Sequence, residues 1–277
     1  MKLIKPSVQI IEQDNYDINS IFKTIELAGR TCYKSENRIT EDSAKEFVER
    51  MIKSGHGAML EHGTVYLTIP NSDITDIGIY KYILNSYSKV FIDHYNTYIT
   101  TNYRVLVENN WLSDLKFISI PELFHQRRTT VKFTCDRGVS HEFVRHRVFS
   151  FAQESTRYCN YCKDKFDNQL TFIIPCWITD IEEGNYEAYC EYHHAKNDSS
   201  KLWYDTCMNA ERVYEDLINQ NWTPQQARSV LPNSLKTELV MTGFNDDWRN
   251  FFNLRCASNA HPQAKELADT LKEKFNF

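Results

Sequence analysis

The chain has 277 residues, of which 42% are hydrophobic and 25% charged, so it has ample apolar material for a core and is not a fully disordered protein. The net charge of −5 argues against a duplex-DNA binder that works through bulk positive charge. No apolar run approaches the ~20 residues needed to cross a bilayer. Residues 1–15 lack the apolar stretch of a signal peptide, so we expect a cytoplasmic protein with reduced thiols.

The N-terminal half alternates between strand and helix signals. Apolar residues with a period of two predict strands, and apolar residues three and four apart predict helices. We expect Thr40 to cap the second helix and Gly55 to follow its end, with Phe47, Val48, Met51 and Ile52 on its inner face. In chain order the predicted elements are a strand at Ser7–Ile11, helices at Asn19–Cys32 and Glu41–Lys53, a strand at Thr64–Ile69, a short helix at Tyr80–Tyr87 and a β-rich stretch at Asn96–Val107.

The C-terminal half continues this mixture. We expect a turn at Asp136–Gly138, a cap at Ser140 for the helix that follows, and a second cap where Thr223 precedes Pro224. In chain order the predicted elements are a strand at Thr129–Cys135, a helix at His141–Arg147, a strand at Leu170–Ile174, a helical region at Ile181–Asn221, a strand at Glu238–Thr242, and helices at Asp246–Cys256 and Pro262–Lys274. Because strands and helices interleave without regular βαβ spacing, we expect an α+β fold in a single domain over residues 1–277.

The densest polar segment spans residues 141–157 and contains three arginines and two histidines. Arginine presents a planar fork of donors that suits phosphate and carboxylate groups. The segment is therefore either a solvated basic face or an anion site held in place by the neighbouring Phe149 and Phe151. Arg228 and Arg255, beside apolar helix residues, either extend to water or reach an anionic ligand. The sequence lacks GxGxxG, Walker A, HExxH and GxSxG motifs, which argues against a Rossmann dehydrogenase, a P-loop NTPase and an α/β-hydrolase.

Four segments in order resemble the flavin-dependent thymidylate synthases. Arg145-His146-Arg147, followed by seven residues and Ser155, matches that family's signature. The other matching segments are HGAMLEH at residues 56–62, ARSVLP at 227–232 and WRNFFNLR at 248–255. The resemblance implies a single α+β domain in a homotetramer with FAD at subunit interfaces. It also implies reductive methylation of dUMP to dTMP, with methylenetetrahydrofolate as carbon donor and NADPH as reductant through FAD.

The resemblance also implies roles for individual residues. Arg255 would lie against the uracil and stabilise negative charge on the ring, which makes it the expected catalytic residue. The residues expected to bind dUMP are Glu142, Arg145, Gln153, Glu154, Ser155, Arg157, Arg228 and Arg255. The residues expected to bind FAD are His56, Arg145, His146, Arg147, Gln153, Asn245 and Asn250. The expected partners are these small molecules, with no nucleic acid, membrane or metal.

Four features depart from the family pattern, one of which is the tail Asn259-Ala260-His261-Pro262-Gln263, which lacks the expected His-Ala-Gln form. Glu142 stands where some members have Gln, and Phe244 stands where others have an Asn of the flavin site, with Asn245 one residue later. The segment 71–128 is longer than the family's minimal connection, and we interpret it as an insertion of unknown role.

Two other functions remain open from the residues. Cys159 and Cys162 form a CxxC pair, and with Cys190 and His193 they offer a Cys3His zinc site of the kind found in nucleic-acid-binding modules. The alternative to that reading is reduced, partly buried thiols, which we favour. A protein that binds flavin or nucleotide without turnover is the second alternative.

Overall fold

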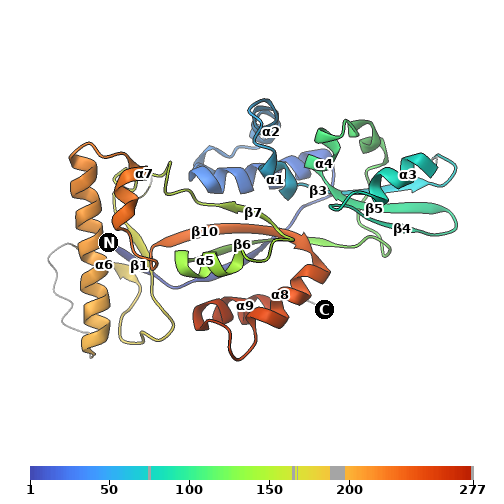
Figure 1. Cartoon of the computed structure of the whole chain (residues 1–277). Coiled ribbons are helices and arrows are strands. Elements are labelled where there is room, and N and C mark those ends of the chain that lie inside the picture. The colour runs from blue at the N-terminus through green and yellow to red at the C-terminus, as the bar shows by residue number, and fades with distance from the viewer. Residues whose placement is uncertain (74–75, 164–165, 167, 188–196, 276–277) are drawn as a thin grey trace.

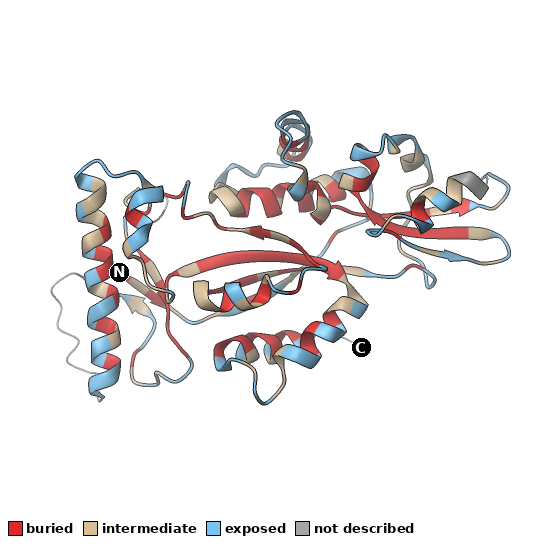
Figure 2. Ribbon diagram, in the orientation of Figure 1, coloured by how far each residue is buried: buried red, intermediate tan, exposed pale blue. Residues whose placement is uncertain are grey.

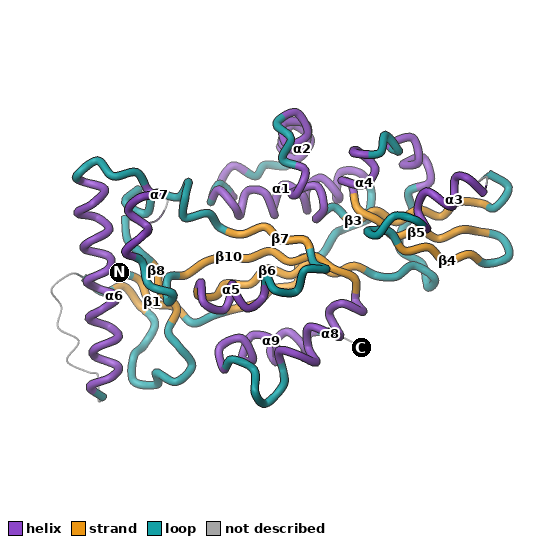
Figure 3. The backbone as a smooth tube through the Cα atoms, viewed as in Figure 1, coloured by secondary structure: helices purple, strands orange, loops and turns teal. Residues whose placement is uncertain are grey.

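The computed structural model describes residues 1–73, 76–163, 166, 168–187 and 197–275. Within these residues it has the α+β architecture that the sequence predicts, with three small sheets and helices packed against them (Figures 1 and 3). In this part of the chain no helix is both long enough and apolar enough to span a membrane.

The central sheet has four strands in the order β2-β6-β10-β7, all paired antiparallel. Their bounds are β2 (Ser7–Ile11), β6 (Arg128–Asp136), β7 (Ser150–Gln153) and β10 (Lys236–Phe244). Because side chains alternate between the two faces of a sheet, Phe133 and its partner Leu239 lie on one face, and Lys132 and its partner Val240 lie on the other. The two faces have different coverings, and this difference decides where the candidate site residues lie.

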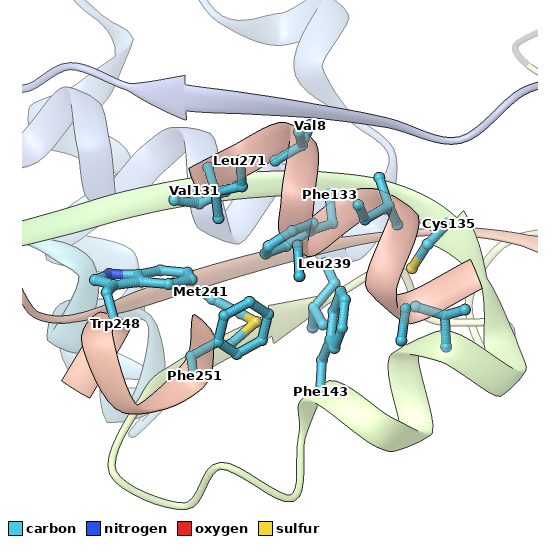
Figure 4. Close-up of a cluster of buried hydrophobic side chains, with 14 of the residues drawn as sticks. Val8, Val131, Phe133, Cys135, Phe143, Leu239, Met241, Trp248, Phe251 and Leu271 are labelled. Atoms are coloured by element: carbon cyan, nitrogen blue, oxygen red, sulfur yellow. The ribbon is translucent and has the colours of Figure 1, made fainter. Parts of the chain in front are cut away.

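The first face is covered by α5 (Arg137–Phe143), α8 (Asn245–Arg255) and α9 (Pro262–Lys274), as Figures 1 and 4 show. Fully buried Phe133, Leu239, Trp248 and Phe251 form the centre of this core. The Trp248 indole also donates to the Thr129 carbonyl at 3.1 Å, so its one polar atom is satisfied. Apolar side chains of α8 therefore fix that helix, and with it Arg255 at its C-terminal end.

The second face is covered by α1 (Ile18–Tyr33), beside which α2 (Ser43–Lys53) lies. The Asp17 side chain accepts a hydrogen bond from the Ser20 N–H at 2.7 Å and so caps the start of α1. Ala28 of α1 packs on Ala152 of β7 and Val240 of β10. These small and β-branched residues let the helix approach the sheet closely.

Two further sheets lie at opposite ends of the central one (Figure 1). One contains β3 (Thr64–Pro70), β5 (Asn96–Asn102) and β4 (Lys89–Ile92), with α3 (Asp76–Ile83) and α4 (Tyr103–Glu108) beside it. The other contains β8 (Thr171–Ile173), β1 (Lys2–Ile4) and β9 (Gly184–Asn185), with α6 (Asp198–Asn219) and α7 (Pro224–Ala227) beside it. Buried residues run through all three regions, as Figure 2 shows.

The segment 71–128, expected to be an insertion, supplies β4 and β5 of the sheet that contains β3, together with α3 and α4. Ile99 and Leu106 from this segment share one buried cluster with Ile25 of α1 and Val48 of α2. The segment is thus packed against the rest of the chain through apolar side chains.

Four predictions in the N-terminal half are corrected. Helix α2 begins at Ser43, and Asp42 occupies the cap position that we expected for Thr40. Ile52, expected on the inner face, is 39% exposed. The β-rich stretch ends at Asn102, because the Asn102 side chain accepts from the Val105 N–H at 3.2 Å and starts α4. The short helix expected at residues 80–87 is α3, which ends at residue 83.

Four predictions in the C-terminal half are also corrected. Asp136–Gly138 is no isolated turn, because Asp136 caps α5 through a 2.6 Å bond from the Val139 N–H, and Ser140 lies inside the helix. Helix α5 ends at Phe143, four residues before the expected Arg147. The helical region expected from residue 181 begins only at Asp198, and part of the preceding segment forms β9. Residues 188–196 lie outside the described part of the chain.

Candidate functional site

Arg255 is held by two other predicted site residues. Its Nη1 donates to Glu142 Oε2 at 2.6 Å, its Nη2 donates to the Glu142 carbonyl at 2.6 Å, and its Nε donates to His146 Nε2 at 2.9 Å. The guanidinium is therefore fixed from both edges, although it remains 15% exposed. Glu142 departs from the family pattern in carrying a negative charge, and the positively charged Arg255 is paired with it.

His146 is buried between aromatic rings and carries no charge near neutral pH. Burial, reinforced by the adjacent Arg255 guanidinium, lowers the pKa of His146 to about 4. Its ring lies 5.0 Å from the Phe251 ring, centre to centre. Because Nε2 accepts from Arg255, the ring must carry its proton on Nδ1. A neutral imidazole is thus an acceptor that orients the catalytic candidate without competing with its positive charge.

Gln153 lies on the same face of the central sheet as Arg255. Its amide donates to Ser140 Oγ at 2.8 Å and to Thr237 Oγ1 at 3.3 Å. Ser140 belongs to α5, the helix that also carries Glu142. Gln153 therefore connects β7 to α5, the helix whose Glu142 side chain binds Arg255.

A second group of predicted residues lies after β7, near the C-terminal end of α1. The Ser155 N–H donates to the Cys32 carbonyl at 3.0 Å, which attaches this loop to α1. Arg157 Nε donates to Gln225 Oε1 at 3.2 Å, and Arg228 Nη1 donates to Thr156 Oγ1 at 3.1 Å. Among the described residues neither guanidinium has a carboxylate within 4.0 Å. Both keep their positive charge for an anion.

His56 joins this second group through two tyrosines. Its Nδ1 lies 3.5 Å from the Tyr33 hydroxyl, and the Tyr33 ring lies 5.6 Å from the Tyr158 ring. The Arg157 guanidinium lies 5.2 Å from the centre of the Tyr158 ring. A continuous row thus runs from His56 to Arg157, two residues that are 101 positions apart in the sequence.

Glu154 is 1% exposed and bound on both oxygens. Lys236 Nζ lies 2.8 Å from its Oε2, and the Tyr161 hydroxyl donates to its Oε1 at 3.2 Å. Its backbone N–H also donates to the Glu238 carbonyl at 2.8 Å. Through these contacts Glu154 can hold the loop that carries Ser155. The expected contact of Glu154 with dUMP stays a prediction.

Glu238 is the centre of a lysine cluster that the sequence did not predict. Lys34, Lys132 and Lys236 approach its carboxylate at 2.8, 2.7 and 3.0 Å. Burial alone would raise the pKa of Glu238, but the three lysines outweigh it and hold that pKa well below its usual range. The cluster joins the end of α1 to β6 and β10, directly behind the loop at Glu154.

Arg147 lies apart from Arg255 and lines a cavity of about 540 Å³. The cavity lies between the loop before β7, the start of α8 and the sheet of β3, β4 and β5. Phe244 lines it, whereas the Asn245 side chain accepts from Thr129 Oγ1 at 2.7 Å and faces a neighbouring hollow. Asn250 and Arg145 are exposed near these elements. Sequence reasoning missed Lys89 and Arg128, which also line the cavity.

The two groups of predicted residues lie on opposite faces of the central sheet. Arg255, Glu142 and His146 belong to the face of α5 and α8, and Glu154 contacts Lys236 on the face of α1. Figure 1 shows these helices on the two sides of the strands. Within the described residues, no hydrogen bond or ion pair joins Arg255 to Ser155, Arg157 or Arg228.

Two of the three cysteines of the possible zinc site lie in the described part of the chain. Cys159 is fully buried in an apolar cluster and Cys162 packs against the same cluster. Burial, together with the nearby Glu215 and Glu211 carboxylates, raises the pKa of the Cys162 thiol to about 11, which disfavours the thiolate that zinc requires. Cys190 and His193 lie outside the described residues. Among the residues that are described, no group of His, Cys, Asp and Glu is placed to hold a metal ion.

The chain is similar to several proteins named flavin-dependent thymidylate synthase. The relative from Pyrococcus furiosus is 29% identical over 141 residues, 51% of each chain. The relative from Corynebacterium aurimucosum is 22% identical over 253 residues, 89% of this chain and 72% of the relative. The relative from Mycolicibacterium gilvum is 31% identical over 139 residues, 48% of this chain and 50% of the relative. The chain thus spans about half the length of the first and third of these proteins.

A family model described as thymidylate synthase complementing protein matches residues 94–276. The matched range contains every predicted site residue except His56. It covers about two thirds of the 277 residues, and the chain therefore belongs to the thymidylate synthase complementing protein family.

Proposed function

We propose that the protein is a flavin-dependent thymidylate synthase that converts dUMP to dTMP. In this proposal methylenetetrahydrofolate supplies the carbon, and NADPH supplies reducing equivalents through FAD. The observation that carries the proposal is the fixed guanidinium of Arg255, held at three points by Glu142 and His146 on α5 and the loop that follows it. Family membership and the names of the similar proteins support the same reaction.

The residues present suit FAD. When bound, the flavin would supply the hydride for the reductive methylation of the uracil ring. The cavity beside Arg147 has a volume of about 540 Å³, within the range of small-molecule sites. Arg147, Lys89 and Arg128 line it and would oppose the negative charge of the cofactor's phosphates. His56, at the end of the row that leads to Arg157, is proposed to meet the flavin region.

Arg157 and Arg228 are proposed to bind the phosphate of dUMP. Near neutral pH a phosphate monoester carries between one and two negative charges, which two guanidiniums match. Both side chains reach solvent, and Gln225 and Thr156 orient them without neutralising them. Ser155, one residue before Thr156 in the same loop, can donate its hydroxyl to the nucleotide. We assign Ser155 a binding role and no covalent one.

Arg255 is proposed to stabilise negative charge on the uracil ring. Hydride transfer to the ring builds charge on the base, and a guanidinium fixed in a partly buried site opposes that charge without having to reorient. Neutral His146 holds one edge of Arg255, so no second positive charge lies beside it. Glu142 shares the other edge, and the uracil must therefore compete with a carboxylate for Arg255.

We further propose that each site is shared between copies of the chain in a homotetramer. Arg255 lies on the face of α5 and α8, whereas Ser155, Arg157 and Arg228 lie in and beside the loop after β7, near the end of α1, and no hydrogen bond or ion pair of the described residues joins the two sets. A closed symmetric oligomer can bring the two sets from neighbouring copies together. The single domain with an insertion at residues 71–128, and a cytoplasmic location, remain parts of this proposal.

The test is dTMP formation by purified protein under anaerobic conditions. With FAD, NADPH, methylenetetrahydrofolate and dUMP present, the wild-type protein is expected to form dTMP, and omission of any one component is expected to stop it. Arg255→Ala should lose methylation by at least about 100-fold while its visible flavin spectrum persists, because its role is charge stabilisation. A wild-type protein that binds FAD and dUMP but forms no dTMP would instead be a non-catalytic binding protein.

A further inference from the structure

The two ends of the loop after β7 meet at one carboxylate. Glu154, at the start of this loop, accepts a hydrogen bond at 3.2 Å from the hydroxyl of Tyr161, seven positions further along the chain. The other oxygen of Glu154 lies 2.8 Å from Lys236 Nζ of β10. The three side chains, which we call the staple, therefore join both ends of the loop 154–161 to the central sheet.

The staple is buried, whereas the loop that it closes presents polar side chains to solvent. Glu154 is 1% exposed and Tyr161 is 5% exposed, while Ser155 is half-buried and Arg157 is exposed. Burial, reinforced by the adjacent Glu154 carboxylate, raises the pKa of Tyr161 well above its usual range. The Tyr161 hydroxyl therefore keeps its proton at neutral pH and donates it to Glu154. The staple is fully formed at that pH and offers almost no surface to a ligand.

Inside the loop, Ser155 fixes the turn from which Arg157 projects. The Ser155 carbonyl accepts from the N–H groups of Tyr158 and Cys159 at 3.2 and 3.0 Å. Ser155 Oγ accepts from the Arg157 N–H at 3.3 Å, which leaves the Ser155 hydroxyl hydrogen able to donate elsewhere. Because these bonds lie between the two ends that the staple joins, the staple constrains the shape of the turn.

The lysine of the staple belongs to an ion-pair network whose formal charges balance. Each of three lysines lies within 4.0 Å of two of three carboxylates, and the members are Lys34, Lys132 and Lys236 with Glu36, Glu154 and Glu238. Three positive and three negative charges so close together exert little net attraction on a phosphate outside the network. The network can therefore act on a bound nucleotide through the geometry of the loop rather than through its charge.

We propose that the staple of Tyr161, Glu154 and Lys236 presets the loop that binds the phosphate of dUMP, and that Tyr161 is a positioning residue for that phosphate. The inference rests on the proposed function, in which Ser155 and Arg157 bind the nucleotide. A loop already held in its binding shape spares the ligand the entropy of ordering these two side chains. Because Tyr161 acts through Ser155 and Arg157, its hydroxyl should matter for nucleotide affinity and not for the chemical step.

The experiment compares Tyr161→Phe with the matched control Tyr82→Phe in the full chain. Tyr161→Phe removes only the hydroxyl and keeps the ring in its apolar cluster. Tyr82 is also buried, and its hydroxyl donates at 2.7 Å to Asp114, a carboxylate that likewise pairs with a lysine, Lys81. Tyr82 lies on α3, outside the loop 154–161. Calorimetry measures dUMP binding, flavin fluorescence measures FAD binding, and steady-state assays give kcat and the KM for dUMP.

Tyr161→Phe is expected to weaken dUMP binding and to raise the KM for dUMP about tenfold, since the nucleotide must then order Ser155 and Arg157 itself. Its kcat at saturating dUMP and its FAD binding should match the wild type, and Tyr82→Phe should bind dUMP as the wild type does. If the wild type forms dTMP but Tyr161→Phe binds dUMP equally well, or if Tyr82→Phe loses dUMP to the same degree, this inference is overturned and the proposed function stands. If the wild type binds dUMP without forming dTMP, and Tyr161→Phe alone binds it more weakly, the staple stands and the proposed function fails. A wild type that binds no dUMP overturns both.

Discussion

Removing the Lys236 charge should destabilise the protein through Glu154. The two side chains form an ion pair at 2.8 Å, with Lys236 13% and Glu154 1% exposed. Lys236→Met leaves a buried carboxylate whose remaining side-chain donor is the Tyr161 hydroxyl. Breaking one partner of a buried pair costs ~3 kcal/mol. Glu238 loses one of its three lysines but keeps Lys34 and Lys132, so we expect little additional cost there.

Thermal and urea unfolding measure this cost. A loss of ~3 kcal/mol corresponds to a drop in Tm of roughly 6–12 °C in a chain of this size. The matched variant Glu154→Gln and the double variant Lys236→Met with Glu154→Gln complete a double-mutant cycle. Because the double variant removes both charges, we expect it to be more stable than Lys236→Met alone. Additive losses in the double variant would refute the idea that Lys236 serves mainly to neutralise Glu154.

Two further predictions concern the surroundings of Arg255. The pKa of His146 is about 4 in the folded chain and about 6.5, its ordinary value, in the unfolded chain. Between pH 4 and pH 6.5 the unfolded state therefore binds more protons than the folded state, and the free energy of unfolding falls as the pH drops. Near pH 5.5 His146 should contribute about 1.2 kcal/mol per pH unit to the slope of the unfolding free energy against pH. Urea unfolding of His146→Gln at several pH values should give a slope smaller by that amount, and an unchanged slope would contradict the shifted pKa. Glu142→Gln should bind dUMP a few-fold more tightly by calorimetry, because the nucleotide no longer competes with a carboxylate for Arg255. Since the Glu142 side chain is 46% exposed, the Glu142→Gln protein should lose less than about 1 kcal/mol of stability. Weaker dUMP binding by this variant would contradict competition between Glu142 and the nucleotide for Arg255.

Local patterns predicted the elements whose periodicity is strong. Strand β2 and helix α9 have the expected bounds, and Gly55, with φ of +71°, follows the end of α2 as expected. The errors lie where one side chain overrides composition. Residues 103–107 have β-rich composition, yet the Asn102 side chain caps them as a helix. Asp136 caps α5 with support from Gln263, which is 127 positions away and donates to its carboxylate at 2.6 Å.

The sequence predicts which residues belong to the candidate site, but it does not predict how these residues are arranged in space. The motif at residues 145–157 is contiguous in sequence, yet the strand β7 within it separates residues onto two faces of a sheet. The lysine cluster at Glu238 joins Lys34, Lys132 and Lys236, which no local pattern connects. Lys89 likewise reaches the cavity only because the sheet of β3, β4 and β5 packs beside β10. Contacts of this kind depend on topology, which periodicity does not encode.

The most direct test of the shared flavin and dUMP site is complementation between two inactive variants. Arg255→Ala and Arg157→Ala, each purified alone, should form little or no dTMP from dUMP. Co-expressed in equal amounts and purified together, they should regain about a quarter of wild-type dTMP formation, because about a quarter of randomly assembled sites would take an intact Arg255 from one chain and an intact Arg157 from another. No recovery of dTMP formation in the mixed oligomer, with the wild type active in the same assay, would contradict a site built across chains from opposite faces of the sheet.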